Sequence, residues 1–207
     1  MRRRLYDNLV KRVLDLPAAV VLIVLLGVPM LLLALWIRLG SRGPAIFRQR
    51  RAGCRGRAFT LLKFRTMRVD ADAYAPSPHS GGDPRLTRIG RRLREKSLDE
   101  LPQIFNVLVG QMSLVGPRPL YQRQAETWNE RQRRRLEVRP GITGYAQAFG
   151  RAGLTLEDKL EMDVYYVEHQ GLWLDLKILV RTFLNAFSGK GDIYEQRYSR
   201  DKERETD

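Results

Sequence analysis

Two adjacent carboxylates, Asp99 and Glu100, are the residues of this sequence best suited to chemistry. They stand in segment 97–103, where Pro102 favours the first turn of a helix, so both acids are expected at or just before a helix N-terminus. One interpretation is structural, because acids there complement the helix dipole and Ser97 with Glu100 matches a capping box. The other is chemical, because a carboxylate kept ionised by that dipole suits a divalent metal ion or acts as a nucleophile.

Basic residues in rigid segments accompany this pair and indicate contacts with phosphate. Arg118 lies between two prolines in segment 116–119, so its guanidinium loses little entropy when it binds a phosphate. Segment 140–144, which follows Arg139, is a predicted tight turn whose glycines can expose backbone N–H groups to an anion. Lys63 begins the segment 63–67 at the end of a predicted strand, and Arg94 belongs to a basic helix just before the pair. Taken singly, each segment also fits an ordinary turn, strand or solvated surface.

The composition narrows the class of ligand. The net charge is +14, and between Arg38 and Val69 the chain has ten Lys or Arg and no Asp or Glu. Such a segment favours an anionic partner, which could be lipid headgroups, nucleic acid or a phosphorylated substrate. The single Cys54 excludes an internal disulfide and fits a reducing compartment. With only His79 and His169 besides, a zinc site is improbable, and a metal ion would be held by oxygen ligands.

The apolar run 16–37 contains 22 residues without a charge, which is enough to cross a bilayer. Pro29 interrupts it near the middle, and basic residues flank both ends, so the positive-inside rule gives no orientation. We favour a re-entrant helix–break–helix over a kinked spanning helix. Its arms, 18–26 and 30–38, would each reach about 13 Å, roughly half of the hydrocarbon core. A buried soluble helix would need a larger domain, and a signal peptide would need a cleavage site that is missing here.

The expected fold is α+β and mostly helical, with three parts. Residues 1–40 form a basic N-terminal helix and the re-entrant anchor, 41–190 the small cytoplasmic domain, and 191–207 a polar tail that we expect to be disordered. Short strands at 45–49 and 58–67 predict a β-hairpin, and 69–85 is a long loop. Helices are expected at 86–96, 99–109, 120–138, 155–169 and 172–187. The arginine-rich run 131–135 is expected on a solvated or headgroup-facing surface. Arginines in rigid turns, paired carboxylates and such an anchor together predict phosphoryl chemistry on a lipid substrate.

Three segments in this order, 43–67, 85–119 and 139–151, resemble the bacterial sugar transferases that are monotopic phosphoglycosyl transferases. The resemblance covers about residues 8–188. It implies transfer of a sugar 1-phosphate from a UDP-sugar to undecaprenyl (polyprenyl) phosphate, with release of UMP. It also implies that Asp99 is the nucleophile of a covalent aspartyl–phosphosugar intermediate, that Glu100 is its partner, and that both hold Mg²⁺. The residues expected to bind substrate or phosphate are Lys63, Arg65, Arg94, Arg118, Arg139, Gly141, Thr143, Gln147, Arg151 and Asp163.

The resemblance also implies a location and partners. The protein would lie in the bacterial inner (cytoplasmic) membrane, with its catalytic domain on the cytoplasmic face and in contact with anionic headgroups. It would catalyse the first membrane step of glycoconjugate synthesis, and a homodimer is compatible with this expectation. Nucleic acid is not expected as a partner. Two departures stand out: Val28 precedes Pro29 where many members have serine, and the chain resembles the minimal catalytic form. The alternative is a non-enzymatic basic membrane-surface protein that binds anionic headgroups or nucleic acid.

Overall fold

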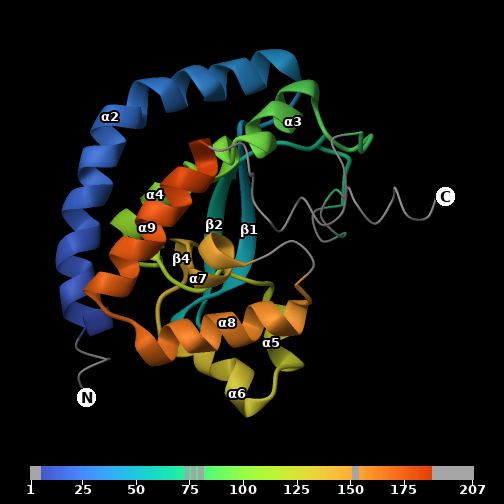
Figure 1. Ribbon diagram of the computed structural model, residues 1–207. Helices are drawn as coiled ribbons and strands as arrows, with labels where there is room; N and C mark the ends of the chain where they lie inside the picture. The colour runs from blue at the N-terminus through green and yellow to red at the C-terminus, as the bar shows by residue number, and fades with distance from the viewer. Residues whose placement is uncertain (1–5, 73–74, 76–77, 79–81, 151–153, 188–207) are drawn as a thin grey trace.

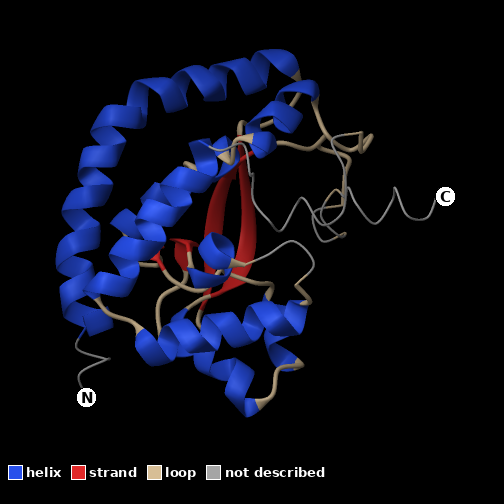
Figure 2. Ribbon diagram, in the orientation of Figure 1, coloured by secondary structure: helices blue, strands red, loops and turns tan. Residues whose placement is uncertain are grey.

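The computed structural model describes residues 6–72, 75, 78, 82–150 and 154–187, which form a mostly helical fold with two small sheets (Figures 1 and 2). This confirms the predicted α+β class. The predicted disordered tail at 191–207 and part of the loop at 69–85 lie outside the described residues.

The long helix α2 (Lys11–Gly40) follows a short π-helical turn, η1 (Tyr6–Val10), and contains both Pro17 and Pro29. The helix is continuous over 30 residues, so the predicted break at 27–29 is wrong. Figure 1 shows instead that α2 bends into two arms. A mid-helix proline removes one hydrogen bond and pushes the helix axis aside, and the turns on either side keep their own bonds.

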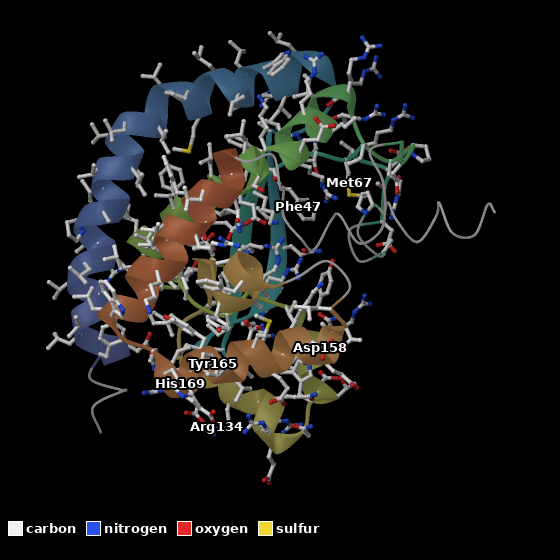
Figure 3. All side chains as sticks on the ribbon, viewed as in Figure 1. Phe47, Met67, Arg134, Asp158, Tyr165 and His169 are labelled. Atoms are coloured by element: carbon white, nitrogen blue, oxygen red, sulfur yellow. The ribbon has the colours of Figure 1, made fainter. Side chains whose placement is uncertain are left out.

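The outer side of α2 is apolar and exposed. Side chains such as Val24, Leu31 and Leu39 are more than 70% exposed, and Figure 3 shows carbon-only side chains projecting outwards along both arms. Within the described residues, α2 is the one helix long and apolar enough to cross a membrane. A continuous apolar surface of this kind is costly in water, which favours contact with lipid.

The predicted hairpin is confirmed. Strand β1 (Ile46–Ala52) pairs antiparallel with β2 (Ala58–Phe64), and the 3₁₀ turn η2 (Cys54–Gly56) lies between them. A second sheet pairs β3 (Ser113–Val115) in parallel with β4 (Gly141–Thr143). The predicted tight turn at 140–144 is therefore wrong. A Cβ on Gly141 would lie 2.1 Å from the Gly116 backbone nitrogen, so this glycine allows two backbones to approach closely.

The helices beyond the hairpin follow local signals, with one exception. Thr155 caps α8 (Leu156–His169) through the predicted capping box with Asp158, and α9 (Leu172–Phe187) follows as expected. The single helix predicted at 120–138 is wrong, because Asn129 has extended backbone angles and its side chain caps a new helix. The segment forms α5 (Gln122–Glu126), α6 (Glu130–Arg133) and the 3₁₀ turn η4 (Arg134–Glu137). The other helices are α3 (Arg88–Glu95), α4 (Gln103–Leu108) and α7 (Tyr145–Phe149).

The inner face of α2 belongs to the protein core. Ala19 is fully buried and packs in a cluster with Val107 of α4, while Ile37 packs in another cluster with Phe64 of β2 and Leu93 of α3. Both arms of α2 are thus held by the domain that carries the carboxylate pair.

Polar contacts fix the two ends of α2 to the same domain. At the N-terminal end, Lys11 Nζ donates to Asp175 Oδ2 at 2.6 Å and to the Val115 carbonyl oxygen at 2.8 Å, and all of these groups are buried. At the C-terminal end, Arg65 Nη2 donates to the carbonyl oxygen and to the hydroxyl of Ser41, both at 2.9 Å. Buried ion pairs with satisfied hydrogen bonds hold their geometry tightly, so α2 is a fixed part of the domain.

Candidate active site

Asp99 and Glu100 lie in the 3₁₀ turn η3 (Leu98–Glu100), just before α4, and are 6% and 9% exposed. The preceding Ser97 adopts a left-handed conformation with φ 53°, and its side chain makes no capping hydrogen bond. The capping-box interpretation is therefore wrong. The left-handed Ser97 changes the direction of the chain after α3, and the turn that follows buries both carboxylates in the domain.

Glu100 is clamped by two cations. Lys63 Nζ, from β2, and Arg118 Nη2, from the segment after β3, donate to the same oxygen, Oε1, at 2.6 and 2.9 Å. Burial by itself would raise the pKa of Glu100, but the charges of Arg118 and Lys63 outweigh burial and lower this pKa to about 2. Glu100 is therefore an ionised group that sets the positions of two cations.

Asp99 is in a different electrostatic state. Its Oδ2 lies 3.9 Å from Lys63 Nζ, and no hydrogen bond to Asp99 is found within the described residues. Burial raises the pKa of Asp99 above its ordinary value, and the cations Lys63, Arg94 and Arg118 only partly offset burial. A desolvated carboxylate without hydrogen bonds is a better nucleophile and metal ligand than a solvated one. The two neighbouring acids thus have separate roles set by their surroundings.

Arg94 is held beside this pair by the segment that follows β2. Its Nε donates to Thr66 Oγ1 at 3.0 Å, and its positive charge acts on Asp99. The predicted residues Lys63, Arg94 and Arg118 therefore come together around the dyad from three separate parts of the chain.

A small, partly open cleft lies beside Glu100. Its polar and backbone lining includes Arg51, Lys63, Glu100, Gln103, Arg118 and Gly141. Sequence reasoning missed Arg51 and Gln103. Arg51 could have been suspected from its place in the acid-free basic segment, but nothing local separates it from the other arginines there.

Asp163 is linked to the site through Arg135, which contacts the backbone of Arg118. Its Oδ2 accepts a hydrogen bond from Arg135 Nη2 at 2.6 Å, and the same nitrogen donates to the Arg118 carbonyl oxygen at 2.6 Å. Both side chains of this ion pair are 2% exposed, so the pair positions the backbone that carries Arg118.

Arg135 corrects the expectation that the run 131–135 lies wholly on the surface. Its guanidinium is buried over the Trp128 ring, 4.8 Å from the ring centroid. Arg134 of the same run pairs with Glu168 and lies at the outer edge of the molecule in Figure 3. Both arginines belong to the 3₁₀ turn η4, in which consecutive side chains point about 120° apart, so one faces the core and the other the surface.

The structure gives other partners to the remaining predicted residues. Arg65 binds the end of α2, and Arg139 pairs with Asp7, with its Nε 3.7 Å from Oδ2. Thr143 Oγ1 lies 2.7 Å from the Thr182 hydroxyl, and the Gln147 side chain donates to the carbonyl oxygen of residue 142. Arg151 lies outside the described residues. A phosphate-binding role for these residues stays a prediction.

Comparison with known proteins places this arrangement in a family. The sequence model described as "Bacterial sugar transferase" matches residues 6–189. The "Uncharacterized sugar transferase EpsL" of Bacillus subtilis is 44% identical over 183 residues, which cover 88% of this chain and 90% of that protein. A UDP-glucose:undecaprenyl-phosphate glucose-1-phosphate transferase of Caulobacter vibrioides is 44% identical over 187 residues, covering 86% of this chain and 70% of that protein.

A UDP-N-acetylgalactosamine-undecaprenyl-phosphate N-acetylgalactosaminephosphotransferase of Aeromonas hydrophila is 39% identical over 192 residues. These cover 88% of this chain and 44% of that protein, so the chain spans less than half of some longer relatives. The family match over most of the chain and the similarity along nearly the full length of the Bacillus protein agree with the resemblance of the three motifs. The chain belongs to the bacterial sugar transferase family.

Proposed function

We propose that this protein transfers a sugar 1-phosphate from a UDP-sugar to undecaprenyl phosphate and releases UMP, as the first membrane step in the synthesis of a glycoconjugate such as capsule, exopolysaccharide, O-antigen or a glycoprotein glycan. The observation that carries the proposal is the buried dyad, in which Asp99 accepts no hydrogen bond from the described residues while Glu100 holds Lys63 and Arg118. The printed activities of the Caulobacter and Aeromonas relatives support the reaction class.

In the first half-reaction, an oxygen of the ionised Asp99 attacks the β-phosphorus of the UDP-sugar. An oxygen–phosphorus bond forms, the bond from that phosphorus to the bridging oxygen breaks, and UMP leaves with the electron pair. In the second, an oxygen of undecaprenyl phosphate attacks the same phosphorus and the bond to Asp99 breaks, which restores the carboxylate. Lys63, Arg94 and Arg118 offset the negative charge that otherwise keeps a carboxylate away from a diphosphate.

The donor set of the dyad fits Mg²⁺. Both cations on Glu100 use Oε1, which would leave Oε2 to bind the ion, and Asp99 would contribute a second carboxylate. The described residues contain no cluster of three or more His, Cys, Asp or Glu, so substrate phosphates and water would complete the coordination. Mg²⁺ commonly binds in this way, through one or two carboxylates plus substrate phosphates. When bound, the ion would neutralise diphosphate charge at the reacting phosphorus.

The experiment that tests this function measures UMP release by the full chain in lipid nanodiscs with magnesium and undecaprenyl phosphate. The donors are UDP-glucose, UDP-galactose and UDP-N-acetylgalactosamine. We expect multiple turnovers with at least one donor, and no more than one UMP per protein without undecaprenyl phosphate. Failure of every donor to yield UMP would favour the alternative of a non-enzymatic basic membrane-surface protein. That alternative does not explain why a surface binder would bury two adjacent acids.

The anchor is proposed to be re-entrant, with the catalytic domain on the cytoplasmic face of the inner membrane. Three observations support this topology: α2 is bent (Figure 1), both arms expose apolar side chains, and both ends bind one domain through Lys11 and Arg65. A straight helix of 30 residues would be about 45 Å long and would separate its ends across the bilayer. A domain on one face could then contact only one of them.

Cysteine labelling in sealed vesicles tests the topology. In a Cys54→Ser background, Leu5→Cys and Arg42→Cys are treated with a membrane-impermeant maleimide, in vesicles of either orientation. We expect both positions to react from the cytoplasmic side, because re-entry returns the chain to the face from which it starts. Reaction of the two positions from opposite sides would show a spanning helix instead. The cysteine-free background is the control for non-specific labelling.

A further inference from the structure

Arg51, at the end of β1, is a cation of the cleft that the dyad chemistry leaves unexplained. Its guanidinium stacks on the Tyr121 ring, 3.8 Å from the centroid. Its Nη2 donates to Gln49 Oε1 at 2.6 Å, while Nη1 lies 3.4 Å from the Pro119 carbonyl oxygen. The remaining nitrogen, Nε, is buried and has no hydrogen-bond partner. A planar guanidinium that is held by an aromatic ring and by Gln49 at the wall of a cleft is well suited to a phosphate.

Arg51 also lacks a carboxylate of its own as an ion-pair partner among the residues that line the cleft. Glu100 is the one acid among the residues lining the cleft, and Lys63 and Arg118 already bind it. Three cations therefore face one carboxylate in this cleft. Burial lowers the pKa of Arg51 to about 10, and the charge of Arg118 contributes to this decrease. The surplus positive charge is costly until an anion enters.

The position of Arg51 indicates which anion this is. The electrostatic neighbours of Asp99 include Lys63, Arg94 and Arg118, whereas those of Arg51 are Tyr121, Arg118 and Glu100. Arg118 is common to both. Arg51 lines the cleft together with Lys63, Glu100 and Arg118, whereas Asp99 is not among the lining residues, so Arg51 faces the cleft at a point removed from the nucleophile. In a diphosphate, the α-phosphate likewise lies one bridging oxygen beyond the β-phosphorus that reacts.

We propose that Arg51 binds the α-phosphate of the nucleotide-sugar donor and so holds the UMP leaving group, with Gln49 and Tyr121 positioning its guanidinium. This inference rests on the proposed function and deepens it. As the bond to the bridging oxygen breaks, negative charge develops on the α-phosphate, and a desolvated cation there stabilises it more strongly than a solvated one would.

The test compares Arg51→Gln with Arg50→Gln, which removes an exposed charge from the same strand. Three quantities are measured: the Kd for UMP by calorimetry, the rate of the first UMP released without acceptor, and the KM for undecaprenyl phosphate. Loss of charge-assisted hydrogen bonds predicts a Kd for UMP raised about 10- to 100-fold and a slower first release in Arg51→Gln. The KM for undecaprenyl phosphate stays unchanged, and Arg50→Gln behaves like wild type.

Several results would overturn the inference: no UMP binding by the wild-type protein, an unchanged Kd for UMP in Arg51→Gln, or a raised KM for undecaprenyl phosphate alone. Should Arg51→Gln melt well below wild type, Arg51→Lys provides the test, because it keeps the charge but loses the planar fork, and we expect its Kd for UMP to rise about fivefold. Failure of the wild type to release UMP from any donor would contradict the proposed function, and the UMP-binding comparison would still decide the role of Arg51.

Discussion

Replacing Asp99 by asparagine abolishes turnover without destabilising the protein. The variant retains the shape of the side chain but lacks the nucleophile, so UMP release falls by at least ~10⁴-fold, comparable to the loss of a nucleophile in other enzymes. Most substitutions of a buried residue lower the stability of the folded state, but we expect Asp99→Asn to raise it. Because burial raises the pKa of Asp99, its ionised form costs free energy in the folded state, and Asp99→Asn removes this cost.

The sign of the stability effect depends on pH in a defined way. The folded-state pKa of Asp99 lies above the ordinary value of 3.8, so the folded protein binds this proton more tightly than the unfolded chain. The destabilisation is absent below pH 3.8 and increases as the pH rises towards the folded-state pKa. Thermal melts of both proteins from pH 4 to 8 should therefore show Asp99→Asn gaining relative to wild type as the pH rises. Retained turnover, or a lower melting temperature than wild type at pH 7.5, would contradict these assignments.

Replacing Glu100 by glutamine should instead damage both stability and activity. Its pKa is lowered from 4.5 to about 2, which corresponds to about 3 kcal/mol of stabilisation by the ionised form. The substitution leaves Lys63 and Arg118 close together without their shared carboxylate, so the free energy of unfolding should fall by about 2–3 kcal/mol. UMP release should fall as well, since both cations lose the contact that positions them beside Asp99.

Urea denaturation of Glu100→Gln against wild type checks this second prediction. The stabilisation by Glu100 is fully present above pH 4.5 and is lost as the pH falls to about 2, so the difference between the proteins should shrink over that range. Glu95→Gln is a matched control, because Glu95 is an exposed acid at the end of α3 and should change stability by no more than about 0.5 kcal/mol. Equal stability of Glu100→Gln and wild type at pH 7 would show that the clamp is not formed.

The opposite expectations for two adjacent acids follow from their different neighbours. Glu100 has two cations on one oxygen, whereas Asp99 has a single cation at 3.9 Å, and its burial outweighs the cations around it. One acid therefore stabilises the site and the other is kept in a state that favours reaction. Active sites commonly combine both, because the group that reacts is the one that the fold leaves incompletely satisfied.

Features with local physical causes could be predicted from the sequence. Alternation and turn residues predict the β-hairpin, and Thr155 with Asp158 predicts the start of α8. The length of the apolar run predicts a membrane helix, and Pro29 predicts a disturbance in it, although the disturbance is a bend and not a break. Each signal acts over a few residues, the distance over which propensity and capping operate.

Features that depend on distant partners were decided only by the tertiary structure. Ser97 with Glu100 matched a capping box, yet Glu100 pairs with Lys63 from 37 positions away because that cation satisfies a buried charge better than a backbone N–H can. Gly141 matched a turn, but it lies where two strands approach closely.

The arginines show the same division. By itself, the sequence determined that a carboxylate pair, a set of cations and an apolar anchor exist in one chain. Among the many arginines, only the fold decided that the Arg135 side chain and the Nε atom of Arg51 are buried while the Arg134 side chain stays partly exposed. Burial is a property of the packed whole, and chemically identical side chains acquire different roles from the long-range contacts that desolvate some of them.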